Sequence, residues 1–270
     1  MNSQFLMCPP DYFGVEYSIN PWMTHNLGCV DTDNAKKQWH SLFETLSKFA
    51  NIELLKPRPH VPDMVFTANA GLVRKELFIP SHFQHLERRQ EETHFRKWFL
   101  RMGYRLKDLA DSVRFEGEGD ALFQPGSNLL WMGYGFRTDP QSQDLLKKLF
   151  SLRIITLQLV DPRFYHLDTC FCPLSGGRVM YYPKAFSVDS LQSIKENIPA
   201  QNRIEISEED AIHFACNAIT IENNLILNHA SPTLIDRLQS LGYRVILKPV
   251  GEFLKAGGGN KCLALSLTSN

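Results

Sequence analysis

Residues 257–265 read GGGNKCLAL, so three consecutive glycines lead to a single thiol, Cys262, and then to an alternating apolar segment. Glycine lets the backbone adopt conformations closed to other residues and approach a ligand closely. The pattern predicts a loop that carries an uncrowded sulfur at the start of a strand. A thiolate is an effective nucleophile once a base or a cation lies nearby. The ordinary alternative is a small buried hydrophobic residue, so the chemistry depends on what the rest of the chain places beside this thiol.

Four other segments share this arrangement, in which polar residues directly precede an apolar, strand-like run. The polar residues recur about every 50 residues, which is typical of folds built from copies of one supersecondary unit. The five segments are 66–73, 116–123, 166–171, 215–221 and 260–265. The repeat therefore predicts a closed architecture of five equivalent modules.

Helical patterns and further extended segments lie between these strands. Apolar residues at helical spacing predict helices over 34–51, 82–102, 142–150, 187–196 and 232–241. Extended segments follow, for example at 153–160 and 243–249. Each unit therefore reads strand, strand, helix, strand, which places the chain in the α/β class. Because no linker or shift in composition divides the chain, residues 1–270 are expected to form one catalytic domain.

Equivalent positions of a closed, rotationally symmetric fold converge on its axis. A cavity that collects carboxylates, amides, an imidazole and a thiol suits a planar cation with several N–H donors, because carboxylates bind guanidinium in a forked geometry. Taken singly, each of these residues has an ordinary alternative as a surface ion pair, a solvated acidic loop or a turn former. The side chains expected to face the cavity are Asn69, Glu116, Glu118, Asp120, His166, Asp168, Asn217 and Cys262.

These residue types predict hydrolysis of a guanidinium group through a covalent intermediate. Cys262 attacks the central carbon, and His166 protonates the departing amine and then activates water against the thiouronium. Glu116 holds the imidazolium, while Asp168 binds the guanidinium nitrogens. The positive charge of the substrate lowers the pKa of the thiol, since an opposite charge at close range favours thiolate.

Composition narrows the class of partner. The 270 residues include 29 basic and 29 acidic residues, so the chain has no net charge to attract nucleic acid or an anionic membrane. A small-molecule substrate is expected, and self-association stays open. No apolar run is long enough to span a bilayer and the N-terminus lacks a secretion pattern, which predicts a cytoplasmic protein. Cys170 and Cys172 lack a second pair at metal-ligand spacing, so no metal site is expected.

Four motifs in combination resemble those of a known superfamily. They are FTANA at 66–70, EGEGD at 116–120, HLDT at 166–169 and GGGNKC at 257–262. The chain resembles, from end to end, the guanidino-group-modifying enzymes of the pentein (amidinotransferase-like) superfamily, which includes arginine deiminases, dimethylarginine dimethylaminohydrolases and arginine dihydrolases. The resemblance implies a five-bladed α/β propeller of ββαβ modules with pseudo-fivefold symmetry. It also implies catalysis by a cysteine, a histidine and an acidic residue, without a metal or a cofactor.

Carried over by motif, the resemblance implies that Cys262 is the nucleophile, His166 the general acid and base, and Glu116 its acidic partner. Asp168 becomes a ligand of the guanidinium. The family's acidic motif is EGGD, whereas this chain has one residue more, so Glu118 stays open as an alternative to Glu116.

The resemblance also implies a substrate-binding set. Arg137 looks like the arginine that binds the amino-acid carboxylate in deiminases, and Arg89 is a weaker match to a second such arginine. Asp120 and Asn217 complete the polar positions expected to contact the substrate.

Asn69 is the informative departure from the deiminase pattern. Arginine deiminases carry FTRD where this chain has FTAN, and the segments at 5–10 and 19–23 look like those of the arginine dihydrolase modules of cyanobacterial enzymes. A carboxylate favours the cationic guanidinium, whereas an amide offers both a donor and an acceptor to a neutral ureido group. Asn69 and Asn20 are therefore expected to retain citrulline for a second attack by Cys262.

The favoured function is accordingly that of an arginine dihydrolase, which converts L-arginine to ornithine, carbon dioxide and two ammonia. An arginine deiminase, a dimethylargininase and an amidinotransferase are the alternatives within the superfamily. A binding protein with the pentein fold but no catalysis is the alternative of another class. It would require loss of the catalytic set, and a ribosomal partner would favour a basic surface, whereas the net charge here is zero.

Overall fold

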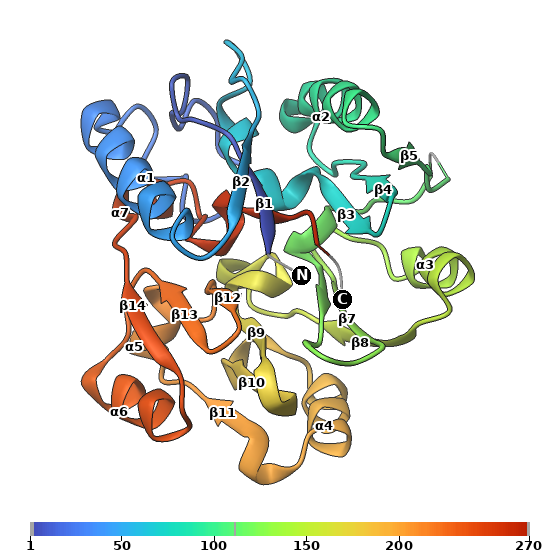
Figure 1. The fold of residues 1–270 in the computed structure, drawn as a ribbon, viewed down its shortest axis with the longest axis vertical. Coiled ribbons are helices and arrows are strands. Elements are labelled where there is room, and N and C mark those ends of the chain that lie inside the picture. Colours follow the sequence, from blue (N-terminus) through green and yellow to red (C-terminus); the bar gives the residue numbers. More distant parts are fainter. Residues whose placement is uncertain (1–2, 111, 269–270) are drawn as a thin grey trace.

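Five three-stranded sheets surround one axis in the computed structural model, which describes residues 3–110 and 112–268 (Figure 1). Within each sheet the middle strand pairs antiparallel with one neighbour and parallel with the other, and a helix connects the parallel pair. This is the predicted strand, strand, helix, strand unit repeated five times. The α/β propeller of ββαβ modules expected from the sequence is confirmed.

The five blades use nearly the whole described chain. Their elements, in blade order, are β15 (Leu265–Ser266), β1 (Gln4–Met7), α1 (Thr32–Leu46) and β2 (Asn51–Leu54); β3 (Gly71–Arg74), β4 (Leu77–Pro80), α2 (Arg89–Arg101) and β5 (Arg105–Leu106); β6 (Ala121–Phe123), β7 (Leu129–Tyr134), α3 (Ser142–Phe150) and β8 (Arg153–Gln158); β9 (Phe171–Leu174), β10 (Arg178–Tyr181), α4 (Val188–Asn197) and β11 (Arg203–Glu205); β12 (Ile219–Ile221), β13 (Asn224–Leu227), α6 (Pro232–Ser240) and β14 (Arg244–Leu247). Short helices α5 (Glu208–Ile212) and α7 (Gly251–Leu254) lie in the connections.

The first blade is closed by the last strand of the chain. β15 pairs antiparallel with β1, with Leu6 opposite Leu265 and Phe5 opposite Ser266. Cys262 lies a few residues before this strand, so the thiol sits at the point where the propeller closes.

The predicted helices are present, with α3 at the predicted bounds. The helix predicted over 82–102 begins only at Arg89, because the residues before it form a β-bridge and a 3-10 turn. His82 forms a bridge with Phe115, and Leu86–Arg88 is a 3-10 turn. Helices α5 and α7 were not predicted because each has only about one turn and leaves too little periodicity to detect.

Helix α1 illustrates how the sequence specifies the outer layer. The Asp31 side chain accepts hydrogen bonds from the amides of Asp33 and Asn34, which caps the helix. Trp39 and Leu42 are buried against the sheet, and burial of each such side chain stabilises the fold by about 1.5–3 kcal/mol. The helices on the outside thereby hold the inner strands, and the turns before them, around the axis.

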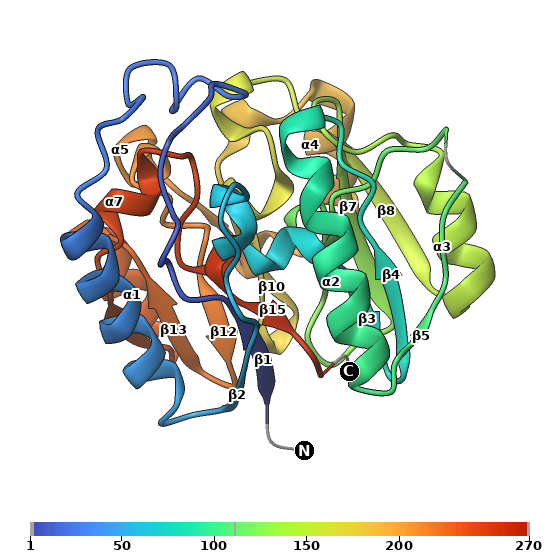
Figure 2. The ribbon, with the colours of Figure 1, turned by 90° about the horizontal axis from the view of Figure 1, so that it is seen from above.

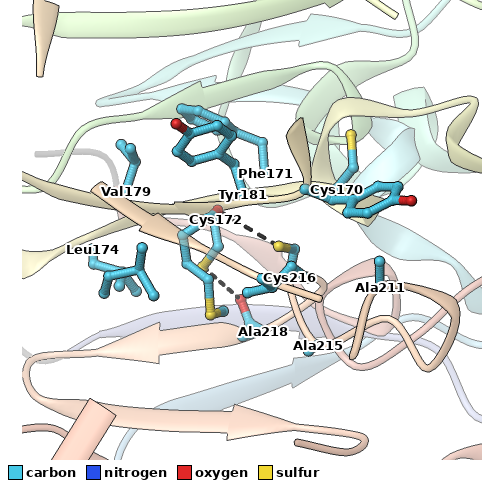
Figure 3. Packing of buried hydrophobic residues seen from close by; sticks show 14 of the residues in the cluster. Cys170, Phe171, Cys172, Leu174, Val179, Tyr181, Ala211, Ala215, Cys216 and Ala218 are labelled. Carbon is cyan, nitrogen blue, oxygen red and sulfur yellow. Dashed lines mark hydrogen bonds between the residues drawn. The ribbon is translucent and has the colours of Figure 1, made fainter. Parts of the chain in front are cut away.

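Three cysteines belong to the apolar packing between the fourth and fifth blades (Figure 3). Cys170 and Cys172 flank the start of β9, and the Cys172 sulfur lies 3.9 Å from the carbonyl oxygen of Ala218. Cys216 lies 3.6 Å from the carbonyl oxygen of Met180. Over residues 3–110 and 112–268, no group of three or more His, Cys, Asp and Glu side chains is placed to hold a metal ion. In the same part of the chain, no helix is long and apolar enough to cross a membrane.

Candidate active site

The five polar segments occupy one structural position, as the repeat predicted. Each lies in a tight turn directly before the strand that begins its module, β3, β6, β9, β12 or β15. Four of the turns are 3-10 helices, and the fifth is closed by the hydrogen bond from Asn217 N to Phe214 O at 3.0 Å. The four helical turns are Thr67–Ala70, Gly117–Gly119, Leu167–Thr169 and Lys261–Leu263.

The glycine run is required by close packing around the nucleophile loop. Gly257 has φ +82°, and a Cβ there would lie 2.8 Å from the Tyr165 hydroxyl. A Cβ on Gly258 would lie 2.3 Å from the ring of Phe66. The loop that presents Cys262 is therefore held tightly from several sides. The expectation of an uncrowded sulfur was wrong, because Cys262 is only 2% exposed.

Cys262 is hydrogen-bonded to two of the predicted residues. Its sulfur lies 3.1 Å from Asn217 Nδ2 and 3.3 Å from Asp168 Oδ2, and its amide donates to Asn217 Oδ1 at 3.1 Å. Burial raises the pKa of the thiol, and the Asp168 carboxylate raises it further. The resting site therefore favours the neutral thiol, and a bound cation is needed to favour thiolate.

His166 and Glu116 form a buried pair. His166 Nε2 lies 2.7 Å from Glu116 Oε2, which also accepts from Arg137 at 3.2 Å, while Gln84 N donates to Glu116 Oε1 at 3.1 Å. Burial alone would raise the pKa of Glu116, but Arg137 and the hydrogen bond from His166 outweigh it and hold the pKa well below its usual value. Glu116 thus stays ionised beside the imidazole. This arrangement holds the imidazole in one orientation and fits a general acid and base.

The alternative acidic partner, Glu118, faces elsewhere. Its Oε2 atom accepts from Lys261 Nζ at 2.6 Å and from Ser266 N at 3.0 Å. The extra residue in the acidic motif therefore does not move Glu116 away from His166.

A small cavity lies between the nucleophile loop and residues 19–23, which we call the lid segment. Asn20 Nδ2 donates to Ala256 O at 3.0 Å, Trp22 Nε1 donates to Arg163 O at 2.7 Å, and Arg137 donates to Ile19 O at 3.0 Å. The cavity measures only about 10 Å³, room for about one water. An amino acid can enter only when the lid segment moves. The residues that line this substrate cavity include Asn20, Asp63, Asn69, Arg88, Arg137, Tyr165 and Cys262.

Of the two arginines expected to bind a carboxylate, the structure places one in the cavity. Arg137 lines it and stacks over Tyr165, with 4.5 Å from the guanidinium carbon to the ring centre. Arg89 instead donates from Nε to Phe83 O at 3.1 Å and does not line the cavity. Its neighbour Arg88 is the buried one, bonded to Asn69 Oδ1 at 2.9 Å. Two adjacent arginines at the start of a helix give no sequence signal that distinguishes the inward side chain from the outward one.

Two polar atoms of the cavity wall have no hydrogen-bond partner within the described part of the chain: Asp63 Oδ1 and Asn69 Nδ2. The sequence did not predict Asp63 as a site residue. Tyr17 donates to its Oδ2 atom at 2.9 Å, and Arg88 Nε lies 3.8 Å from the same oxygen. Buried polar groups normally find partners, so these two atoms suit a polar ligand that donates to a carboxylate and accepts from an amide.

Besides Arg89, three predicted substrate ligands do not line this cavity: Asp168, Asp120 and Asn217. Asp168 lies beside the Cys262 sulfur and lines a second cavity. Asp120 accepts from Leu167 N at 3.0 Å and so fixes the turn that follows His166. Asn217 bonds the sulfur and the amide of Cys262. The structure therefore places Asp120 and Asn217 as supports of the groups expected to react. Sequence periodicity indicates which turn a residue occupies, but it does not indicate whether the side chain points into the cavity or back into the turn.

The cost of keeping Asp168 buried can be measured. Burial raises its pKa to about 7, against an opposing effect of Lys261, so the folded protein binds a proton that the unfolded chain releases near pH 4. The free energy of unfolding therefore falls as pH rises from about 4 to about 7. At pH 8, Asp168→Asn is expected to be more stable than the wild type by about 4 kcal/mol, and at pH 4 the difference should vanish. Thermal unfolding of both proteins at the two pH values tests this, and a less stable variant at pH 8 would contradict it.

A five-bladed propeller with a cysteine, a His–Glu pair and a buried carboxylate around one axial site defines the pentein class of guanidino-group-modifying enzymes. The family model described as "N,N dimethylarginine dimethylhydrolase, eukaryotic" matches residues 22–268. The chain belongs to this dimethylarginine dimethylaminohydrolase family.

Two relatives and one solved structure show how the chain is placed within the family. It is 46% identical over 265 residues to the bifunctional arginine dihydrolase/ornithine cyclodeaminase ArgZ of a Synechocystis species, covering 98% of this chain and 38% of ArgZ. It is 34% identical to the dimethylarginine dimethylaminohydrolase of Mycobacterium tuberculosis, covering 98% of this chain and 85% of that protein. A crystal structure of the N-terminal domain of ArgZ, covalently bound to a reaction intermediate, superposes with a TM-score of 0.98 at 46% identity, covering 99% of this chain and 98% of that one. The chain thus spans well under half the length of ArgZ.

Proposed function

We propose that this protein hydrolyses the guanidinium group of L-arginine twice and releases ornithine, carbon dioxide and two ammonia. The observation that carries the proposal is a single cavity that brings Cys262 together with Arg137 and the partnerless polar atoms of Asp63 and Asn69. Such a lining suits a zwitterionic amino acid, because an arginine binds the α-carboxylate and a carboxylate binds the α-ammonium. The guanidinium is placed at Asp168, which does not line the cavity but lies 3.3 Å from the Cys262 sulfur, and whose Oδ1 atom has no partner among residues 3–110 and 112–268.

In the first half-reaction the bound cation favours ionisation of the Cys262 thiol, and the thiol proton passes to solvent. Cys262 and Asp168 are 3.3 Å apart, so a guanidinium bound to this carboxylate is close enough to stabilise the thiolate. The sulfur forms a bond to the guanidinium carbon, and a terminal C–N bond breaks as His166 gives its proton to the departing ammonia. Water then adds to the thiouronium, the C–S bond breaks, and citrulline forms while His166 recovers a proton.

In the second half-reaction the same thiolate attacks the ureido carbon of citrulline. A C–N bond breaks, ammonia leaves, and a thiocarbamate remains on Cys262. A second water cleaves the C–S bond, and the carbamate of ornithine loses carbon dioxide. The partnerless Nδ2 of Asn69 is a donor suited to the ureido oxygen, and Asn20 belongs to the lid segment that closes over the retained citrulline.

A dimethylargininase is the second candidate, favoured by the family model and by the relative in Mycobacterium tuberculosis. The dihydrolase ranks first because identity is higher to ArgZ, at 46% against 34%, and because the cavity wall carries an amide with a free donor at Asn69. A deiminase would stop at citrulline.

We also propose that residues 1–270 act as one catalytic domain in the cytoplasm, where a reducing environment keeps the thiol of Cys262 free.

The product ratio tests the proposed function. Purified protein incubated with L-arginine, without added metal, is expected to release two ammonia for each ornithine and no more than a trace of citrulline. Amino-acid chromatography and an ammonia assay on the same samples measure this ratio. One ammonia per citrulline would make the protein a deiminase instead, and turnover of dimethylarginine but not arginine would make it a dimethylargininase.

A further inference from the structure

A second, larger cavity opens on the face of the propeller opposite the lid segment. It measures about 350 Å³, and its mouth is lined by Ser3, Ser266 and Thr268. Figure 2 shows that β1 begins and β15 ends at the lower edge of the molecule, whereas the N-terminal loops that follow β1 extend to the upper edge. This cavity, called the axial cavity below, therefore approaches the nucleophile from the side away from the substrate.

The inner end of the axial cavity is formed by three charged residues next to the nucleophile. Glu118, Asp168 and Lys261 all line it, and Lys261 directly precedes Cys262 in the chain. Asp168 is also the residue whose carboxylate lies 3.3 Å from the Cys262 sulfur. One carboxylate therefore separates the axial cavity from the reacting atom.

The ion pair between Lys261 and Glu118 spans this inner end. The two charged groups are 2.6 Å apart, with side chains 14% and 7% exposed. Glu118 is fixed by the amide of Ser266 at 3.0 Å, whereas a lysine ammonium sits on a flexible four-carbon stem. Lys261 Nζ also donates to Ala264 O at 3.1 Å, so a swing of the lysine breaks both of these contacts while Glu118 keeps its bond to Ser266. The pair has the properties of a gate, and neither residue is used by the mechanism derived above.

The proposed reaction needs a route for water and ammonia that does not pass through the substrate cavity. Each C–S cleavage consumes one water, and each attack by Cys262 releases one ammonia. During these steps the amino-acid part of the intermediate fills a cavity that measures about 10 Å³ before it expands. Opening the lid segment between steps would also release citrulline before the second attack.

We propose that the axial cavity delivers water to the Cys262 adduct and drains ammonia from it, with the Lys261–Glu118 pair as the gate. The inference rests on the proposed guanidinium hydrolysis and adds the route of its second substrate and its smallest product. Water enters past Lys261, adds to the amidine or thiocarbamate carbon, and the sulfur leaves as thiolate. Ammonia departs in the opposite direction while the lid segment stays closed.

Filling the axial cavity tests the route. Thr220 on β12 and Thr268 both line the axial cavity and are half-buried. Thr220→Trp and Thr268→Trp are expected to lower kcat for L-arginine by about tenfold, with kcat/KM changed far less, because hydrolysis of the adduct becomes limiting. Acid-quenched samples should show the mass of the adduct on Cys262 in most of the enzyme. Thr156→Trp, at a half-buried position on β8 outside the axial cavity, is the matched control and should retain the wild-type kcat.

The outcomes separate the inference from the proposed function. Folding of each variant is checked by circular dichroism and by its melting temperature. An active wild type whose folded tryptophan variants keep kcat within twofold, without adduct accumulation, would overturn the water route but leave the hydrolase intact. A wild type that turns over no guanidino compound would overturn the proposed function, and the inference would fall with it.

Discussion

Replacing Cys262 by serine is expected to abolish ornithine and citrulline formation, with kcat lowered by more than about 1,000-fold. The sulfur is the only protein atom that bonds to the guanidinium carbon in the proposed mechanism, so no other side chain can substitute for it. Burial and the carboxylate of Asp168, 3.3 Å away, already raise the pKa of the thiol. A serine hydroxyl, with a far higher intrinsic pKa, would not ionise there even beside a bound cation.

The measurement is the rate of product formation from L-arginine, together with the intact mass of the quenched protein. Wild-type samples should contain a covalent adduct, and Cys262→Ser samples should not. Cys8→Ser is the matched control, because Cys8 is equally buried at 1% exposure and lines neither the substrate cavity nor the axial cavity. Residual activity of Cys262→Ser above a tenth of the wild type would remove this residue from the role of nucleophile.

The repeat made most of the architecture predictable from sequence. A polar turn before each inner strand, repeated five times, correctly placed Asn69, Glu116, His166, Asn217 and Cys262 at one structural phase. Five equivalent modules can bury their apolar faces only by closing around an axis. The position of a residue within the repeat therefore showed which residues from distant parts of the chain lie together. Secondary-structure patterns alone do not show this.

The direction of individual side chains could not be predicted in the same way. Asp120 shares the phase of the proposed catalytic residues but turns back to the amide of Leu167, and Arg88 rather than Arg89 enters the cavity wall. Such choices depend on hydrogen bonds between distant segments, for example from Arg88 to Asn69. A single sequence does not record these contacts, because each partner is an ordinary polar residue in its own segment.

Ion pairs explain why most of the buried charges are compatible with folding. Glu116 pairs with Arg137 and is hydrogen-bonded to His166, and Glu118 pairs with Lys261. Asp168 is incompletely compensated, since burial raises its pKa to about 7 despite Lys261. A cationic guanidinium bound there would relieve this cost, so substrate binding and lid closure should reinforce each other.

Asn69→Asp is expected to turn the protein into an enzyme that stops at citrulline, with ornithine formation lowered by more than about tenfold. Asn69 Oδ1 already accepts from Arg88 at 2.9 Å, and aspartate preserves this bond. The partnerless Nδ2, however, becomes a second carboxylate oxygen. That oxygen can still face a cationic guanidinium, but it repels the carbonyl oxygen of a neutral ureido group.

The variant is measured with two substrates, since L-arginine reports both steps and supplied citrulline reports only the second. Turnover of L-arginine should continue with one ammonia per citrulline, while citrulline itself should no longer be consumed. Asn224→Asp, at a half-buried position on β13 that lines neither cavity, controls for an added carboxylate. Two ammonia per ornithine from Asn69→Asp would show that the amide is not needed for the second attack. Loss of the first step as well would place Asn69 in guanidinium binding, because the one atom changed would then serve the cation rather than the ureido group.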